Sequence, residues 1–117
     1  MGSIVFHAIA FERKSSWTLG EYVLCFSSDG NLELWNEPAG KLIWESSTQG
    51  ERLVMQSDGN LVIYAGDGDP VWATGTSGHE DAVLVLEEDG TMAILSSDRK
   101  DRLWHVTPRD AWVTENG

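Results

Sequence analysis

The stretch of sequence that decides the fold is Gln56-Ser57-Asp58-Gly59-Asn60-Leu61-Val62-Ile63-Tyr64. Similar stretches occur at residues 27–35 and 87–95. The three Asp-Gly pairs begin 29 and 31 residues apart, and a Trp follows each Asp after 14 or 15 residues. Matched landmarks at a period near thirty residues indicate a repeat architecture. We therefore divide the chain into repeats of about residues 17–47, 48–77 and 78–107 and a C-terminal tail, residues 108–117.

Each repeat has the composition of β-strands. Val, Leu, Ile and aromatic residues occur in short runs that are broken by Gly, Asp, Asn and Pro. No stretch keeps the 3,4 spacing of apolar residues that is typical of a helix. We predict an all-β chain in which each repeat forms a hairpin that turns at Asp-Gly, followed by a third strand that ends near the Trp.

The length of the hairpin loop follows from the alternation of apolar residues. A two-residue loop at Asp58-Gly59 would pair polar Gln56 with apolar Leu61 on one face. A three-residue loop that includes Ser57 instead pairs Met55 with Leu61, and its geometry is a type I turn followed by a left-handed glycine. This register predicts one wholly apolar face in each hairpin. The residues on that face are Leu24, Phe26, Leu32 and Leu34, then Leu53, Met55, Leu61 and Ile63, and finally Leu84, Leu86, Met92 and Ile94.

The three spaced tryptophans, Trp44, Trp72 and Trp104, end corresponding strands in the three repeats. Large aromatic rings at equivalent positions are well suited to pack against one another in a shared core. We therefore expect them to form the hydrophobic centre of the domain.

The opposite face of the middle hairpin carries polar side chains. Gln56, Asn60 and Tyr64 supply hydrogen-bond donors and acceptors, Val62 lies between them, and Asp58 is in the turn. This mixture suits a sugar ring, which has hydroxyl groups that donate and accept and C–H patches that favour an apolar contact. No nucleophile is paired with a base here, so the pattern predicts binding and not catalysis.

The spaced motif Gln56-x-Asp58-x-Asn60-x-Val62-x-Tyr64 resembles, at all five positions, that of the monocot mannose-binding (bulb-type) lectins. The threefold repeat and the Trp after each motif are also similar to that family, and the resemblance covers roughly residues 17–107. It implies a β-prism II fold of three four-stranded antiparallel sheets with pseudo-threefold symmetry. It also implies that the chain binds mannose or mannose-containing glycans without a metal or another cofactor.

The resemblance further implies a role for each motif residue. Asp58 and Asn60 would hold the axial 2-hydroxyl of mannose, which distinguishes mannose from glucose. Gln56 would contact the 3-hydroxyl and Tyr64 the 4-hydroxyl, while Val62 would touch the carbons of the ring.

The first repeat departs from this motif. It keeps Asp29 and Asn31 but carries Ser27, Glu33 and Trp35 at the other three positions. A serine is too short to reach the sugar, a carboxylate disturbs the apolar floor, and an indole lacks the hydroxyl group. Asp29 and Asn31 are therefore at most a weak second site.

The third repeat keeps only Asp89 of the motif, so we expect it to be structural. One intact site among three leaves an alternative open, namely a lectin-fold module for protein–protein interaction with vestigial sugar sites.

Carboxylates at residues 80–81 and 87–89 resemble the pair of a glycoside hydrolase. They are more consistent with a solvated surface, so we do not expect an enzyme.

Composition restricts the partners of this single domain of 117 residues. The net charge of −11 opposes binding to nucleic acid and to anionic membranes. The three histidines share no metal-ligand spacing, and Cys25, the only cysteine, cannot form an intrachain disulfide. The sequence shows neither a membrane-spanning run nor a signal peptide. The compartment therefore stays open between the cytoplasm and secretion after removal of a leader.

The tail beyond Trp104 contains Trp112 and Val113, which a frayed end would not need. Lectins of the resembling family often dimerise by exchanging C-terminal strands. The resemblance thus implies a homodimer through the C-terminal strand, and the alternative is a tail that folds back on its own sheet.

Overall fold

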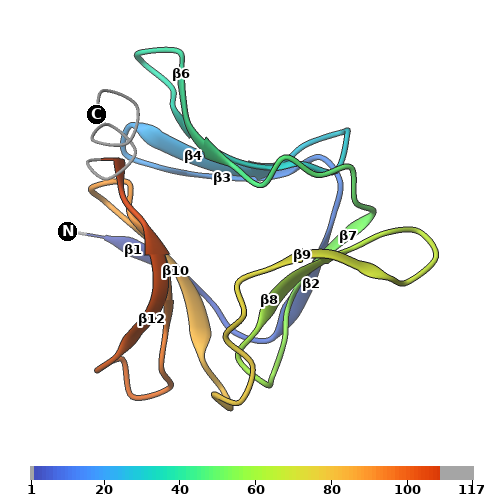
Figure 1. Cartoon of the computed structure of the whole chain (residues 1–117). Coiled ribbons are helices and arrows are strands. Elements are labelled where there is room, and N and C mark those ends of the chain that lie inside the picture. Colours follow the sequence, from blue (N-terminus) through green and yellow to red (C-terminus); the bar gives the residue numbers. More distant parts are fainter. Residues whose placement is uncertain (1, 109–117) are drawn as a thin grey trace, which may run out of the picture.

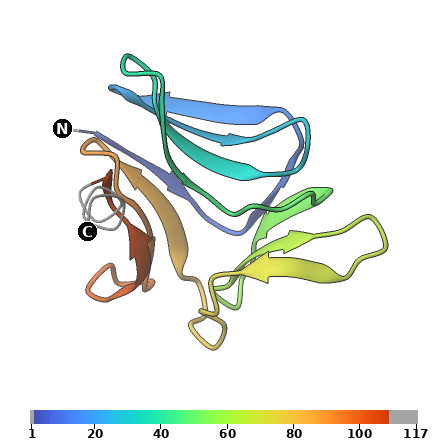
Figure 2. The same cartoon turned by 45° about the horizontal axis from the view of Figure 1, so that its top comes forward.

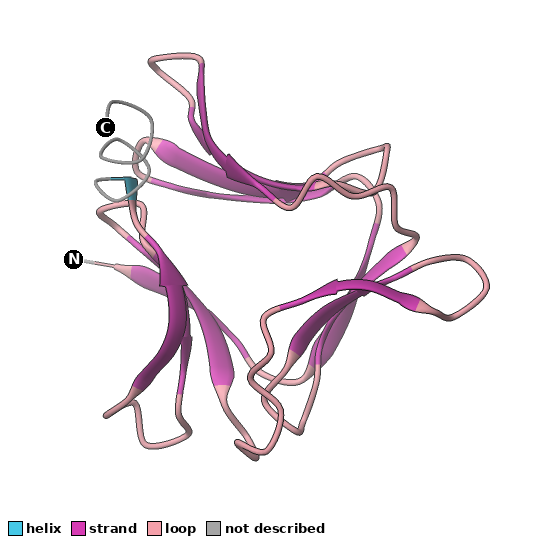
Figure 3. Cartoon of the chain, in the orientation of Figure 1, coloured by secondary structure: helices cyan, strands magenta, loops and turns pink. Residues whose placement is uncertain are grey.

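The computed structural model describes residues 2–108, which contain twelve β-strands in three four-stranded sheets. The sheets stand around a common centre like the three sides of a prism (Figure 1), and the tilted view in Figure 2 shows the same enclosure. Strands and loops account for nearly all of this part of the chain (Figure 3). The predicted all-β architecture of three four-stranded antiparallel sheets is confirmed.

Each sheet is built around one of the Asp-Gly hairpins. The first sheet contains β3 (Ser15–Leu19), β4 (Tyr22–Phe26), β5 (Leu32–Asn36) and β6 (Lys41–Glu45). The second, or middle, sheet contains β2 (Ile9–Glu12), β7 (Arg52–Met55), β8 (Leu61–Tyr64) and β9 (Pro70–Ala73). The third sheet contains β1 (Ser3–Phe6), β10 (Val83–Glu87), β11 (Met92–Leu95) and β12 (Arg102–Val106).

Two of the three sheets take their fourth strand from the N-terminal segment. β1 pairs with β10, with Ser3 opposite Glu87, and β2 pairs with β7, with Ile9 opposite Met55. The segment thus crosses from the third sheet to the middle one (Figure 1) before the first repeat begins. The alignment of repeats did not include these strands, because residues 3–12 contain neither an Asp-Gly pair nor a Trp.

The middle hairpin has the predicted three-residue loop. Met55 lies opposite Leu61. The backbone amide of Gly59 donates to the carbonyl oxygen of Gln56 at 3.0 Å, and the backbone amide of Gln56 donates to the carbonyl oxygen of Asn60 at 2.9 Å. Gly59 has a φ of 93°, in the left-handed region. A Cβ atom there would also lie 2.3 Å from the carbonyl oxygen of His79. Both conformation and space therefore require glycine at this turn.

The inner faces of the three hairpins form the core. All twelve residues predicted for the apolar face are buried, with at most 1% of their surface exposed. Burying one such side chain contributes roughly 1.5–3 kcal/mol. A shift of the hairpin register by one residue would turn these side chains to the outside, so the core fixes the register.

Two aromatic triads complete the interior. Trp44, Trp72 and Trp104 pack with ring centroids 5.5–5.8 Å apart, which confirms the expected cluster. A second triad contains Phe6, Phe11 and Trp17, with centroids 4.6–5.3 Å apart. Each sheet supplies one ring to each triad, from its two opposite edge strands. The rings therefore join the three sheets at both edges.

The predicted exchange of the C-terminal strand concerns the tail, of which residues 109–117 lie outside the described residues. The third sheet receives its strand β12 from the same chain, because β12 pairs with β11. No helix within residues 2–108 is long and apolar enough to cross a membrane.

Candidate functional site

The outer face of the middle sheet brings the predicted polar residues together. Gln56 directly follows β7, Asn60 directly precedes β8, and Val62 and Tyr64 lie at alternate positions of β8. The side-chain amide of Gln56 donates a hydrogen bond to the hydroxyl of Tyr64. Val62, between Asn60 and Tyr64, is only 3% exposed. The result is a shallow apolar floor with polar groups on its borders.

Asp58 lies in the turn that precedes this face. Its Oδ1 atom accepts a 3.0 Å hydrogen bond from the amide of Asn60, which fixes the turn and the start of β8. The residue is exposed, and its Oδ2 atom accepts no bond from any described residue. One carboxylate oxygen therefore supports the fold while the other stays available to a ligand.

The amide group of Asn60 is held in one orientation. Its Oδ1 atom accepts three hydrogen bonds, from the hydroxyl of Thr74 at 3.1 Å and from the amides of Gly75 and Thr76 at 3.0 and 3.2 Å. Three donors at one atom assign that atom as the oxygen. The Nδ2 atom donates to no described residue. Asn60 consequently offers two N–H donors to a ligand.

Sequence reasoning did not identify Thr74 and Thr76, which position Asn60. Their hydroxyl groups lie 2.7 Å apart, and that of Thr76 donates to the carbonyl oxygen of Gly59 at 2.6 Å. A signal for them exists in the sequence. Hydroxyl residues follow Trp72 after two and four positions, and Ser46 and Thr48 follow Trp44 in the same way.

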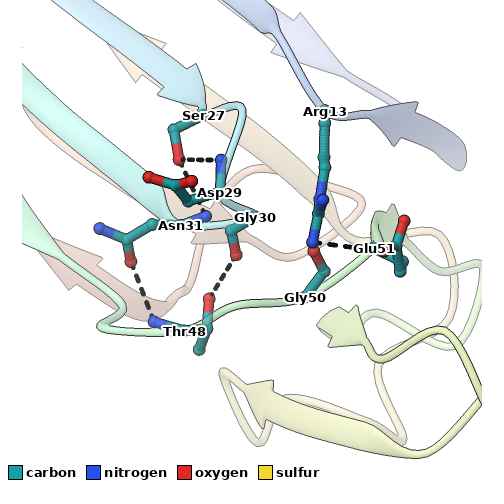
Figure 4. A network of polar contacts seen from close by, with 8 residues as sticks. All are labelled: Arg13, Ser27, Asp29, Gly30, Asn31, Thr48, Gly50 and Glu51. Atoms are coloured by element: carbon teal, nitrogen blue, oxygen red, sulfur yellow. Dashed lines mark hydrogen bonds and ion pairs between the residues drawn. The ribbon is translucent and has the colours of Figure 1, made fainter.

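The first repeat builds the same cage around Asn31 (Figure 4). Its Oδ1 atom accepts hydrogen bonds of 3.0 Å from the hydroxyl of Ser46 and from the amide of Thr48. The hydroxyl of Thr48 donates to the carbonyl oxygen of Gly30 at 2.7 Å. The turn differs, because here the hydroxyl of Ser27 accepts from the amides of Asp29 and Asn31 at 3.2 and 3.1 Å.

Two carboxylates use up the donors of this first site. The Nδ2 atom of Asn31 donates to Glu33 at 3.0 Å and to Glu45 at 2.8 Å. Glu33 also accepts a 2.9 Å bond from the indole N–H of Trp35. Asp29 and Asn31, predicted as a weak second site, thus stand in the expected place. A sugar that bound there would have to displace internal hydrogen bonds.

Cys25 lies opposite Glu33 on the outer face of the first sheet. Its thiol donates to Glu33 at 3.5 Å. Burial first, and then the neighbouring Glu33 carboxylate, raise the pKa of Cys25 to about 11. The side chain is therefore a neutral thiol near pH 7, with little character of a nucleophile.

The outer face of the third repeat has an apolar centre, and an ion pair between Glu87 and Arg102 lies at its border. Val85 lies between Val5 and Ala93 across three strands, and both Val85 and Ala93 are buried. The amide of Thr91 donates to Asp89 at 2.9 Å, and this bond contributes most to a pKa of Asp89 below its usual range. Asp89 thus serves the turn, and Glu87, Thr91 and Leu95 stand where the middle repeat has Gln56, Asn60 and Tyr64.

The described residues do not bring a set of metal-ligating side chains together. Within residues 2–108, no group of three or more His, Cys, Asp or Glu side chains is placed to hold a metal ion. What the middle sheet presents is a fixed amide, an open carboxylate oxygen and a Gln–Tyr pair around an apolar floor.

Comparisons with known proteins concern the family and the fold of the chain. No family model matches the chain. The chain is 34% identical to a mannose-specific lectin of Aloe arborescens over 82 residues, which cover 65% of this chain and 73% of that lectin. A lectin of Polygonatum cyrtonema, solved in complex with a monomannoside, superposes with a TM-score of 0.70 and 33% identity, over 82% of this chain and 90% of that one.

The mannose-specific agglutinin of snowdrop (Galanthus nivalis), solved in complex with methyl-α-D-mannoside, gives a TM-score of 0.73 at 29% identity. That match covers 83% of this chain and 93% of the agglutinin. The three-sheet prism therefore has the β-prism II fold of these lectins. With its fold, its repeats and its identity to the Aloe protein, the chain belongs to the family of monocot mannose-binding, or bulb-type, lectins.

Proposed function

We propose that this protein is a mannose-binding lectin with one competent site, on the outer face of the middle sheet. The relatives above are mannose-specific lectins or were solved with a mannoside, and we infer binding without turnover. The observation that supports one site is the contrast between two equivalent amides. The Nδ2 atom of Asn60 is open to a ligand, whereas that of Asn31 is held by Glu33 and Glu45.

In this proposal, Asp58 and Asn60 recognise the same hydroxyl group. A hydroxyl both donates and accepts, so it can donate to Oδ2 of Asp58 while it accepts from Nδ2 of Asn60. The axial 2-hydroxyl of mannose is the group assigned to this pair. Glucose carries an equatorial hydroxyl at that carbon, which would point away from the pair.

The remaining contacts orient the sugar ring. The Gln56 amide and the Tyr64 hydroxyl, which bond to each other in the free site, would turn to the 3- and 4-hydroxyls. The ring carbons would lie on Val62. Each hydrogen bond contributes roughly 0.5–1.5 kcal/mol net, and the site is shallow. We therefore expect a millimolar Kd for the monosaccharide, or about −4 kcal/mol.

The test is titration calorimetry with methyl α-mannoside on the wild type, Asn60→Ala and Asn31→Ala. The two substitutions remove the same amide from the same kind of cage, so Asn31→Ala is a matched control. We expect Asn60→Ala to lose binding while Asn31→Ala keeps it, with circular dichroism confirming that both fold. Unchanged affinity in a folded Asn60→Ala variant would refute the assignment.

A second sugar tests the role of the axial hydroxyl. Methyl α-glucoside should bind at least tenfold more weakly than methyl α-mannoside. Equal affinity would contradict the pairing of Asp58 with Asn60. If the folded wild type bound neither sugar at tens of millimolar, the chain would instead be an interaction module with vestigial sugar sites.

We also propose a homodimer through the C-terminal strand, because one weak site per chain gains useful avidity only when sites are held together. Trp112 and Val113 of the tail supply apolar surface for such a contact. Light scattering on the full chain and on a chain that ends at Thr107 tests this proposal. A dimer is expected only for the full chain, and two monomers at tens of micromolar would contradict it.

A further inference from the structure

Arg52 of β7 lies directly opposite Tyr64 of β8 in the middle sheet. The two side chains also meet, because the guanidinium carbon of Arg52 lies over the Tyr64 ring, 5.7 Å from its centroid. A cation at this distance is attracted by the electron density of an aromatic face. The tyrosine that we propose to contact the sugar therefore carries a positive charge at the face of its ring.

The same pair of positions is occupied differently in the other two sheets. Val23 lies opposite Trp35 in the first sheet. Val83 lies opposite Leu95 in the third sheet. Trp35 and Leu95 stand where the middle repeat has Tyr64, and neither carries a hydroxyl group. All three hairpins form, so the arginine is not needed for the hairpin, and it accompanies the one tyrosine of the three positions.

Arg52 takes the ring in preference to a carboxylate that is within reach of its strand. Glu12 of β2 lies opposite Arg52 on the side away from Tyr64. Arg52 nevertheless makes no side-chain hydrogen bond or ion pair with any described residue. Arg13, by contrast, is paired with Glu51 at 3.3 Å (Figure 4). The charge of Arg52 is therefore directed to the tyrosine and is not neutralised by a bound carboxylate.

A cation at the ring face changes what the hydroxyl of Tyr64 can offer to a ligand. The hydroxyl oxygen already accepts a hydrogen bond from the side-chain amide of Gln56. The positive charge of Arg52 draws electron density towards the ring. This strengthens the O–H group as a donor and weakens the oxygen as an acceptor. The hydroxyl proton is thus the part of Tyr64 that is best prepared for a ligand.

We propose that Arg52 is a positioning residue of the mannose site, which fixes the ring of Tyr64 and strengthens its hydroxyl as the donor to the 4-hydroxyl of the sugar. This inference rests on the proposed mannose site and adds to it a residue outside the binding motif. The effect of Arg52 passes through Tyr64, so it exists only for sugars that carry a 4-hydroxyl.

The expected effect is small, because Arg52 is exposed and water screens its charge. A cation–π interaction at an exposed site corresponds to a change of about two- to fivefold in Kd. The direction of the change is informative. If Tyr64 donates to the sugar, loss of the cation weakens binding, and if Tyr64 accepted from the sugar, the same loss would tighten it.

The test is NMR titration with methyl α-mannoside and with its 4-deoxy analogue, on the wild type, Arg52→Met and Arg52→Lys. Arg52→Met keeps a long side chain without the charge, and Arg52→Lys keeps a cation. The matched control is Arg99→Met, the same substitution in an exposed turn of the third sheet. Circular dichroism confirms that each variant folds.

The Kd of methyl α-mannoside should rise about two- to fivefold in Arg52→Met. It should stay near the wild-type value in Arg52→Lys and in Arg99→Met. The 4-deoxy analogue should bind more weakly than the mannoside, and with the same Kd in all four proteins. A merely structural role of Arg52 would instead weaken both sugars alike.

Three results would overturn the role of Arg52 and leave the mannose site standing. They are an unchanged Kd in Arg52→Met, a loss in Arg52→Lys as large as that in Arg52→Met, and an equal loss for the 4-deoxy analogue. Tighter binding by Arg52→Met would overturn the assignment of Tyr64 as the donor. If no mannoside binds the folded wild type, the mannose site itself has failed, and the role of Arg52 fails with it.

Discussion

The hydroxyl of Thr76 donates a 2.6 Å hydrogen bond to the carbonyl oxygen of Gly59, which precedes it by 17 residues. This bond ties the segment after β9 to the turn that carries Asp58 and Asn60. Thr76 is only 4% exposed, so water cannot easily replace it as the donor. The position of the proposed binding residues therefore depends on a residue outside the binding motif.

We expect Thr76→Val to lower the free energy of unfolding by about 1–3 kcal/mol, because it leaves the buried carbonyl of Gly59 without its donor. Mannose affinity should fall as well, since the turn would be held less firmly. Urea denaturation and sugar titration measure the two effects. Ser77→Ala, at an exposed neighbouring position, is the control. Native stability in Thr76→Val would show that the bond is dispensable.

Trp72→Ala should cost about 3–5 kcal/mol, because it leaves a cavity between two other indoles. That is a large part of the ~5–15 kcal/mol expected for the whole domain. Trp35→Ala, on the outer face of the first sheet, removes the same ring outside the triads and should cost less. A melting temperature near that of the wild type in Trp72→Ala would place the residue outside the core.

The first site should bind sugar when Ser27, Glu33 and Trp35, the three residues that differ from the motif, are replaced together. The variant Ser27→Gln, Glu33→Val, Trp35→Tyr restores the motif around Asn31, whose oxygen is already held by the cage. Calorimetry should then give two sugars per chain where the wild type binds one. Addition of Asn31→Ala should return the ratio to one. A stoichiometry of one in the triple variant would indicate that Glu45 alone keeps the site closed.

Cys25 should react slowly with iodoacetamide. Since its pKa is raised to about 11, its thiolate fraction at pH 8 should be roughly a hundredfold or more below that of an ordinary cysteine. Glu33→Gln removes the repulsion by the carboxylate but leaves the burial, so the rate should rise only in part. The urea-unfolded chain supplies the reference rate. Equal rates for the wild type and Glu33→Gln would exclude an effect of Glu33.

The same raised pKa links stability to alkaline pH. The folded state holds the thiol proton more tightly than the unfolded chain does. The contribution of Cys25 to stability is therefore complete below its ordinary pKa, near 8.5, and is lost as the pH rises towards 11. Urea denaturation of the wild type and of Cys25→Ala at pH 8 and pH 10.5 should show a decline that is smaller in the variant.

The parts of the fold that follow from the alternation of apolar and polar residues along a strand could be predicted from the sequence. One register places Leu53, Met55, Leu61 and Ile63 on the same face, and no other register does, so pairing and burial could be predicted together. The tryptophan triad followed from equal spacing in the three repeats. In each case a repeated pattern carried the information.

Features that depend on contacts between distant segments could not be predicted in this way. Residues 3–12 carry none of the landmarks of the repeats, so their addition to two sheets was not foreseen. Glu45 of β6, which accepts a hydrogen bond from Asn31 in addition to that of Glu33, belongs to no motif. The approach of Arg52 to Tyr64 needs the cross-strand register and the orientation of both side chains.

The N-terminal strands also affect how the chain can fold as it is synthesised. The first sheet is contiguous, from β3 to β6, and all its strands have been synthesised once Glu45 has been made. β1 is made earlier, but it must wait for residues 83–87 before it can pair. Closing so long a loop is slow. We expect one side of the prism to form during synthesis while β1 is still unpaired, and pulsed proteolysis of stalled chains would detect that order.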